Sequence, residues 1–163
     1  MAGGTHQMMF VVAAMTLLSQ ITIIVSQFMG STIETNLQSE ATITATGLAQ
    51  SLLREVTMKG FDENTLTDPA DMTSDLTLDV NFGPDAGEAY PNFDDIDDYD
   101  EYARIVTTAR LGDYRVRTEV WYVRDNNLNE EAPLRTFYKK VIVTVDQNTN
   151  IAYPVTLSKI ISY

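Results

Sequence analysis

The residues most able to do chemistry are a run of aspartates near the middle of the chain, in the segment FDDIDDYDEY between positions 93 and 102. Carboxylates are ligands that Ca²⁺ prefers, so the run is a candidate calcium site. Its spacing does not match an EF-hand loop, and no glycine stands where such a loop makes its tight turn. The candidate calcium ligands are Asp94, Asp95, Asp97, Asp98 and Asp100.

A second interpretation treats the same run as structural. In it, the acidic side chains are solvated, while Phe93, Ile96 and Tyr99 pack inward. In a further structural interpretation, the aspartates pair with arginines of a neighbouring strand or of another subunit. The candidate arginines are Arg104, Arg110 and Arg115. The sequence favours the solvated loop and leaves calcium open.

Paired carboxylates can also serve as a general acid and a general base, but the chain offers little to complete a catalytic site. Its single histidine is His6, and it has no cysteine. It carries neither a glycine-rich phosphate loop nor a nucleophile elbow. We therefore expect no enzymatic activity and no organic cofactor.

The net charge of −12 and the isoelectric point of about 4.3 bear on the kind of partner. Nucleic-acid binding gains affinity from clustered Lys and Arg that displace counterions, so the acidic balance argues against that class. It suits instead a soluble outer surface whose copies repel one another. Without cysteine there are no disulfides and no thiolate metal sites, so stability must come from packing or assembly.

The element that organises the chain is an apolar stretch, MMFVVAAMTLLSQITIIVSQFMGSTI, from Met8 to Ile33. Between Met1 and Ile33 there is no Asp, Glu, Lys or Arg. A helix over the 22 residues from Met8 to Met29 is about 33 Å long at roughly 1.5 Å per residue, enough to cross a bilayer. A signal peptide fits less well, because no basic segment precedes the run and no A-x-A type site follows it.

Hydroxyl and amide side chains recur within this stretch, from Thr16 to Gln27. Such groups are costly against lipid, but they form interhelical hydrogen bonds where a helix packs with copies of itself. The stretch therefore indicates a helix that is surrounded by other helices in its working state. Its assembly core is predicted to consist of Met8, Phe10, Val11, Val12, Met15, Leu17, Leu18, Ile21, Ile23, Ile24, Val25 and Phe28.

The same helix is predicted to continue as an amphipathic half over residues 34–60, after the hydrophobic assembly or transmembrane half of residues 1–33. Gly30 is expected to bend or locally melt it, because glycine costs about 1 kcal/mol in a helix interior. Leu48, Leu52 and Val56 recur on one face at helical spacing, and Gly60 is a C-cap signal. At the other end, Gly3 and Gly4 are candidate sites of N-terminal processing.

Residues 61–163 are predicted to form a globular head. Residues 61–103 make an acidic loop region, with one or two short strands around Leu76 to Val80. Residues 104–163 make an antiparallel sheet, because apolar and polar residues alternate over 113–124 and 137–145. Further strands are expected at 102–110 and 153–163, and an exposed loop at 125–133. The helix would cover the apolar face of the sheet, which gives an α+β fold.

This layout resembles that of type IV pilins and pseudopilins. Three segments carry the resemblance, and the MSHA-type minor pilins are the nearest in character. The helix segment LAQSLLR at 48–54 resembles the region where pilin helices meet the head. FDDIDDYD at 93–100 resembles an acidic FDD-x-DDY loop of those proteins. YKKVIVTV at 138–145, followed by PVTLSKIIS at 154–162, resembles their paired C-terminal strands.

The resemblance implies a pilin-like "lollipop" that polymerises through its N-terminal helix as the structural subunit of an extracellular type IV pilus-like filament. The implied partners are copies of itself in a helical filament, the inner membrane before assembly and the pilus assembly machinery. Attachment, motility or DNA uptake would be the outputs at the cell surface. The sequence departs from the pattern in one respect, since pilins place Glu fifth in the mature chain and no acid here precedes Glu34. The alternatives are a membrane-anchored single-pass protein and a minor or tip pilin with a binding head.

Overall fold

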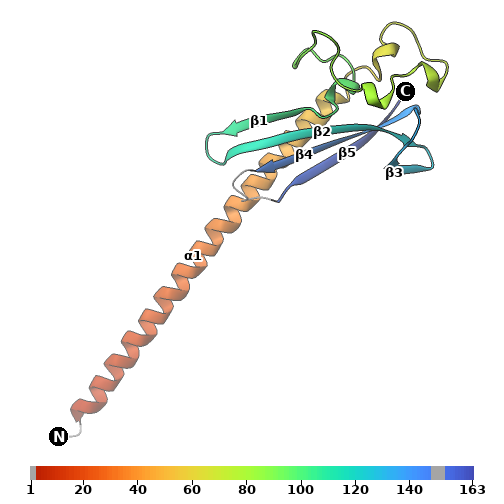
Figure 1. Cartoon of the computed structure of the whole chain (residues 1–163). Helices are drawn as coiled ribbons and strands as arrows, with labels where there is room; N and C mark the ends of the chain where they lie inside the picture. The colour runs from red at the N-terminus through yellow and green to blue at the C-terminus, as the bar shows by residue number, and fades with distance from the viewer. Residues whose placement is uncertain (1–2, 148–152) are drawn as a thin grey trace. The chain divides into compact units, whose positions relative to one another are not determined.

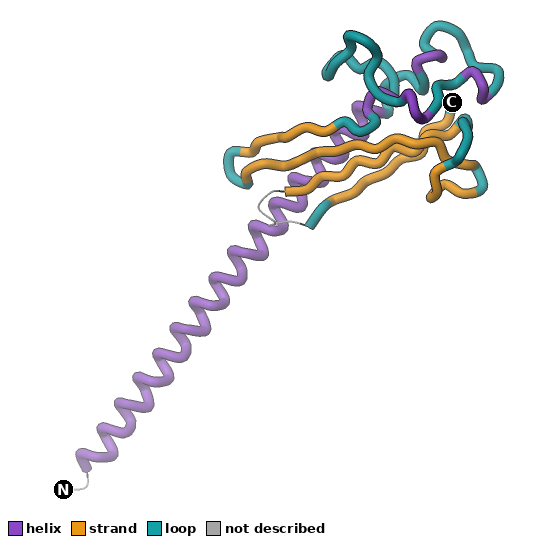
Figure 2. Tube along the Cα trace, viewed as in Figure 1, coloured by secondary structure: helices purple, strands orange, loops and turns teal. Residues whose placement is uncertain are grey.

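The computed structural model describes residues 3–147 and 153–163. A long helix, α1 (Gly3–Val56), is followed by four short 3₁₀ turns and five strands. The turns are η1 (Glu63–Thr65), η2 (Thr73–Asp75), η3 (Asp79–Asn81) and η4 (Asp97–Tyr99). The strands are β1 (Ala103–Thr108), β2 (Gly112–Arg124), β3 (Asn127–Glu131), β4 (Tyr138–Gln147) and β5 (Val155–Ser162). The fold is α+β, as the sequence predicts (Figures 1 and 2).

The chain divides into two compact units, and the division falls within α1. The first unit ends at Glu40, and the second runs from Ala41 to Tyr163. The first unit is helix alone over its described residues, and α1 continues through Gly30 without a break. A bend at Gly30 therefore stays a prediction, and local melting is not seen.

The last part of α1 belongs to the second unit and is held by one buried stripe. Ala41, Ala45, Ala49, Leu52 and Val56 recur every three or four residues and are each at most 2% exposed. That spacing places them on one face of a helix. The small alanine side chains keep the stripe flat, and the Tyr114 hydroxyl of β2 reaches the carbonyl oxygen of Ala41 at 3.3 Å.

The helix ends at Val56, four residues before the predicted stop. The amides of Met58 and Lys59 bond three residues back, to Glu55 and Val56, which closes the helix with a tight turn. Gly60 has a different role, because its N–H donates to Asp94 O at 2.9 Å and its carbonyl accepts the amide of Ile96 at 3.0 Å. It thus joins the helix exit to the acidic loop.

The sheet has the order β1-β2-β4-β5, and every pair in it is antiparallel. The predicted alternation is confirmed, because the inward side chains of β2 and β4 are buried while Arg115, Arg117 and Glu119 are exposed. The buried side chains are Tyr114, Val116, Thr118, Val120, Tyr122, Val141, Val143 and Val145. Together with the buried stripe of α1 they form the core of the second unit.

Two local expectations were wrong. The segment around Leu76 to Val80 forms no strand, since Thr77 N donates to the carboxylate of Asp62 and η3 begins at Asp79. The predicted loop at 125–133 contains β3, which pairs with the end of β2 through Val123 and Glu131. The residues of β3 are almost all exposed, so no apolar alternation marks this strand.

Replacing Leu52 by Ala tests the packing of α1 on the sheet. Leu52 is 0% exposed, so the truncation should lower the free energy of unfolding by roughly 2–5 kcal/mol. Ile43→Ala is the matched control, because Ile43 is 72% exposed on the same helix and its truncation should cost little. Denaturant unfolding of the detergent-solubilised chain, followed by the fluorescence of its single tryptophan, Trp121 in β2, gives both values. Equal losses would contradict the packing described.

Candidate functional site

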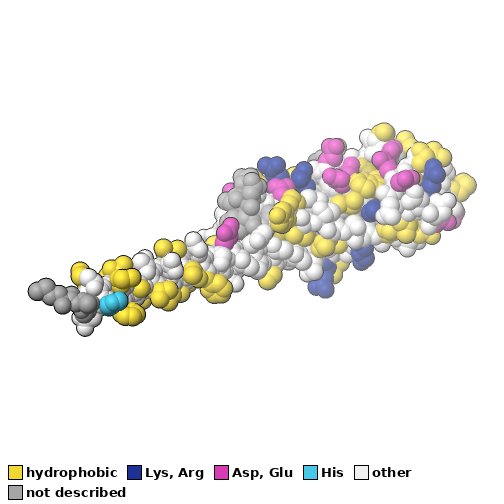
Figure 3. All heavy atoms as spheres, turned by 90° about the horizontal axis from the view of Figure 1, so that it is seen from below, with side chains coloured by type: hydrophobic (Ala, Val, Ile, Leu, Met, Phe, Trp, Pro, Cys, Tyr) yellow, Lys and Arg dark blue, Asp and Glu magenta, His cyan; other side chains and the backbone are white. Residues whose placement is uncertain are grey.

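The first candidate site is the apolar half of α1, whose side chains are exposed among the residues that the structure describes. Its large side chains are between 50% exposed, at Val25, and 75% exposed, at Phe10. Figure 3 shows apolar side chains spread along this part of the helix. The helix is long and apolar enough to cross a membrane. All the predicted assembly-core residues lie on it, and their role in assembly stays a prediction.

Some polar groups of this half are bonded within their own helix, and others are not. The hydroxyls of Thr16 and Thr22 donate to carbonyls of their own helix, at 2.8 and 2.9 Å, so they are satisfied in any apolar surroundings. Within the described chain, the amides of Gln20 and Gln27 have no such partner. These two residues are seven apart, or two turns, so they share one face. Apolar surroundings therefore leave two amides that need partners from outside the chain.

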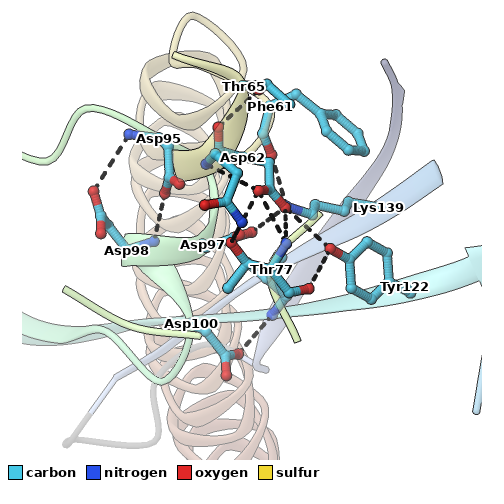
Figure 4. Close-up of polar contacts among 12 residues, drawn as sticks. Phe61, Asp62, Thr65, Thr77, Asp95, Asp97, Asp98, Asp100, Tyr122 and Lys139 are labelled. Carbon is cyan, nitrogen blue, oxygen red and sulfur yellow. Dashed lines mark hydrogen bonds and ion pairs between the residues drawn. The ribbon is translucent and has the colours of Figure 1, made fainter. Parts of the chain in front are cut away.

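The second candidate site is a buried charge cluster around Lys139 (Figure 4). Lys139 Nζ lies 2.8 Å from Asp62 Oδ2, 2.5 Å from Asp97 Oδ1 and 2.7 Å from the carbonyl oxygen of Phe61. All three ammonium protons therefore have acceptors. The side chains of Lys139 and Asp62 are 0% exposed, and that of Asp97 is 4% exposed. We call these three residues the Lys139 cluster.

Strand register places the lysine there. Lys139 precedes the buried Val141, Val143 and Val145 by even steps along β4, so its side chain points to the same face. Sequence reasoning missed it, although the alternation that predicts β4 also sends this lysine inward. A buried ammonium requires buried acids as partners. The inward position of Lys139 in the β4 alternation was therefore a signal that some of the aspartates are buried beside it.

The two carboxylates of the Lys139 cluster have different surroundings. Asp62 also accepts hydrogen bonds from the Thr77 amide and hydroxyl, the Asn64 amide and the Tyr122 hydroxyl. Burial works to raise the pKa of Asp62, but the charge of Lys139 and the hydrogen bonds from Lys139 and Thr77 outweigh it, and the pKa is lowered. Asp62 is the ionised partner of the lysine.

Asp97 shows the opposite balance. Its Oδ1 contacts Lys139, but its Oδ2 is buried and has no hydrogen-bond partner in the described part of the chain. Burial raises the pKa of Asp97 to about 8, against the lowering effect of the Lys139 charge. One ammonium therefore stands beside one carboxylate and one carboxyl that retains its proton at neutral pH.

The rest of the acidic run has structural contacts of its own. Asp98 Oδ2 accepts the amides of Asp94 and Asp95, and Asp95 Oδ1 accepts the amide of Asp98 at 3.0 Å. Burial is the main cause that raises the pKa of Asp95, to about 7. Asp100 accepts the amide of Val120 at 2.9 Å, which ties the loop to β2. These contacts hold the loop in one conformation.

The interpretation of the run as a solvated loop is therefore wrong for three of its acids. Asp95, Asp97 and Asp98 are at most 4% exposed. The inward packing of Phe93, Ile96 and Tyr99 is confirmed, since these residues are at most 3% exposed. The cation beside Asp97 is Lys139, whereas the guanidinium of Arg104 contacts Tyr90.

The five aspartates do not converge on a single calcium centre. Among the residues that the structure describes, the three acids whose oxygens come within 4.8 Å of one another are Glu88, Asp94 and Asp98. Two of these belong to the predicted set, and Glu88 was not in it. Asp97 instead contacts Lys139, and Asp100 accepts a hydrogen bond from Val120 in β2. Calcium binding stays a prediction, and Glu88, Asp94 and Asp98 are the residues that could hold the ion.

An open cleft of about 580 Å³ lies beside the Lys139 cluster. Asp95, Asp97 and Asp98 line it, together with Thr77 and Arg135. Arg135 donates to the carbonyls of Ser74 and Leu76, which also line the cleft.

Comparison of the chain with protein-family models, with curated proteins and with solved structures finds no match in any of the three.

Replacing Lys139 by Met tests the charge balance of the Lys139 cluster. The change leaves the ionised Asp62 buried without its counter-charge, which should lower the free energy of unfolding by about 3–5 kcal/mol. Lys159→Met is the matched control, since Lys159 is exposed on β5 and its loss should be nearly neutral. Urea unfolding followed by circular dichroism measures both variants. A K139M chain as stable as K159M would contradict the burial described.

The pH dependence of stability tests the burial of Asp95. Its pKa is about 7 when folded against 3.8 for the ordinary side chain, so the folded state retains a proton that the unfolded chain releases. The free energy of unfolding should therefore fall as pH rises from 3.8 to about 7. Melting temperatures at about pH 5 and about pH 8 should differ less for Asp95→Asn than for the unaltered chain. Asp125→Asn, at an exposed position, should keep the full difference.

Proposed function

We propose that this chain is the structural subunit of an extracellular type IV pilus-like filament and polymerises through the apolar half of α1. The observation that carries the proposal is a long helix whose apolar side chains are at least 50% exposed from Met8 to Phe28. Full removal of such a side chain from water is worth roughly 1.5–3 kcal/mol, so this half of α1 must be buried in the working protein.

Two surroundings can bury it, a bilayer and other helices. The apolar side chains are satisfied in either, and so are the self-bonded hydroxyls of Thr16 and Thr22. The amides of Gln20 and Gln27 favour the second, because lipid offers them no hydrogen-bond partner and a neighbouring helix does. A helix that rests in the inner membrane and then packs with copies of itself uses the same surface twice.

The second unit supports the same proposal. Its core uses the last part of α1, so each copy would present an α+β domain around the packed helices. The net charge of −12 keeps the outer surface soluble. A heterologous contact between copies that does not close on itself gives a helical filament. Surface attachment, motility or DNA uptake would follow from such a filament.

Electron microscopy of material sheared from the cell surface tests the proposal. Filaments composed of this chain are expected. A chain that stays in the membrane fraction and never enters sheared filaments would contradict the proposal and favour a single-pass anchor with a binding head. Filaments made of another protein that carry only a few copies of this chain would also contradict it, in favour of a minor or tip pilin.

Replacing both Gln20 and Gln27 by Leu separates assembly from membrane insertion. The variant is more apolar, so it should insert into the membrane as well as the unaltered chain, but it loses the proposed interhelical hydrogen bonds. We expect a lower yield of sheared filament with the same amount of chain in the membrane. Thr22→Val is the control, because that hydroxyl is already bonded within its own helix. Equal filament yields from all three chains would refute the role given to the glutamines.

A further inference from the structure

The Lys139 cluster has a geometry that a simple ion pair does not require. An amine contacts two carboxyl groups, and all three groups are enclosed by the protein. Lys139 Nζ also lies over three aromatic rings, 4.6 Å from the centroid of Phe61, 5.0 Å from that of Phe82 and 5.1 Å from that of Tyr122. These rings surround the amine together with its three acceptors on Phe61, Asp62 and Asp97, the last two of which Figure 4 draws beside it.

The carboxyl groups of Asp62 and Asp97 differ in how many hydrogen bonds hold them. Both oxygens of Asp62 accept the Thr77 amide at 3.0 Å, and the Tyr122 hydroxyl adds a bond of 3.1 Å, so this carboxylate is fixed in place. Asp97 has one oxygen 2.5 Å from the amine and another that is buried without a partner. Its carboxyl carbon, one bond from the contacting oxygen, therefore lies beside the amine and is not surrounded by donors that would hold it as a stable anion.

We propose that Lys139 and Asp97 join in an intramolecular amide bond, with Asp62 as the group that takes up the lysine proton. The Asp62 carboxylate removes one proton from the Lys139 ammonium. The free amine then attacks Cγ of the protonated Asp97 side chain and forms the C–N bond. The C–OH bond breaks, and the hydroxyl leaves with a second amine proton as water. The products are the amide, one water molecule and a protonated Asp62, and nothing is oxidised or reduced.

The surroundings favour this condensation over the ion pair. In water the same groups stay ionised and do not react, but enclosure holds the reacting atoms together and removes the solvent that stabilises their charges. The product replaces a buried ammonium with a neutral amide. The water leaves through the cleft, which Asp97 lines. The bond would tie η4 to β4 across 42 positions of sequence in a chain that has no cysteine for a disulfide.

Peptide mapping of the full chain, purified in detergent, tests the bond. Trypsin cleaves after Lys59, Arg104, Arg135 and Lys140, so the bond joins residues 60–104 to residues 136–140. We expect one branched peptide, lighter than the sum of its two parts by the mass of one water molecule and stable to boiling in detergent. Separate peptides of full mass, with Lys139 open to trypsin, would overturn the proposal. Because the mass loss is sought within these peptides, processing of the N-terminus does not affect the result.

Substitutions at Lys139, Asp97 and Asp62 test which residues form the amide bond. Lys139→Arg retains the charge but cannot form the amide, so it should give two separate peptides, whereas Lys159→Arg should give the branched one. Asp97→Ala leaves the neutral pair of Lys139 and Asp62, so the chain should fold, as checked by circular dichroism, without the bond. A branched peptide in folded D97A would overturn the assignment to Asp97. In folded Asp62→Asn the bond should form at least about 100-fold more slowly, as expected on loss of a proton acceptor. An unchanged rate would refute the role of Asp62.

Discussion

The constraint on which the rest of this structure depends is that the apolar side chains in the first half of α1 are exposed among the residues that the structure describes. A helix this apolar is not stable as an exposed rod in water, because its side chains gain nothing from being ordered there. The charge distribution matches that constraint, with no Asp, Glu, Lys or Arg before Glu34 and a net charge of −12 over the whole chain. One continuous helix thus carries two surfaces, one that the second unit buries and one that something else must bury.

Inside the second unit, the buried lysine Lys139 must be matched by acidic partners. Lys139 draws Asp62, just after the helix exit, and Asp97, in the acidic loop, against the buried face of β4. The region between the helix and the first strand has little regular structure, so these contacts and the Asp95–Asp98 hydrogen bonds hold it in place. The acidic composition, which suggests a solvated loop, instead supplies the acceptors that a buried lysine and several backbone amides need.

Much of this fold could be predicted from the sequence because its main elements are periodic. The spacing of Leu48, Leu52 and Val56 predicts the packed face of α1, where Leu52 and Val56 are buried and Leu48 is half-buried. The alternation around Val116 and Val143 predicts the sheet. Features that depend on contacts between distant segments could not be predicted in this way. Gly60 pairs with the acidic loop and does not itself end α1, and β3 forms by backbone pairing without an apolar pattern. The burial of Asp97 depends on Lys139, 42 residues away, which composition alone does not reveal.

The measurement that tests most directly what buries α1 is photo-crosslinking in living cells with a photoreactive amino acid in place of Ile24. Such a group reacts with whatever lies against it, whether lipid, another protein or another copy of this chain. Packing of α1 with copies of itself predicts chain-to-chain adducts in the sheared surface fraction, with the attachment points inside residues 8–33 of the second copy. Adducts with lipid alone, or with an unrelated protein alone, in every fraction would contradict it.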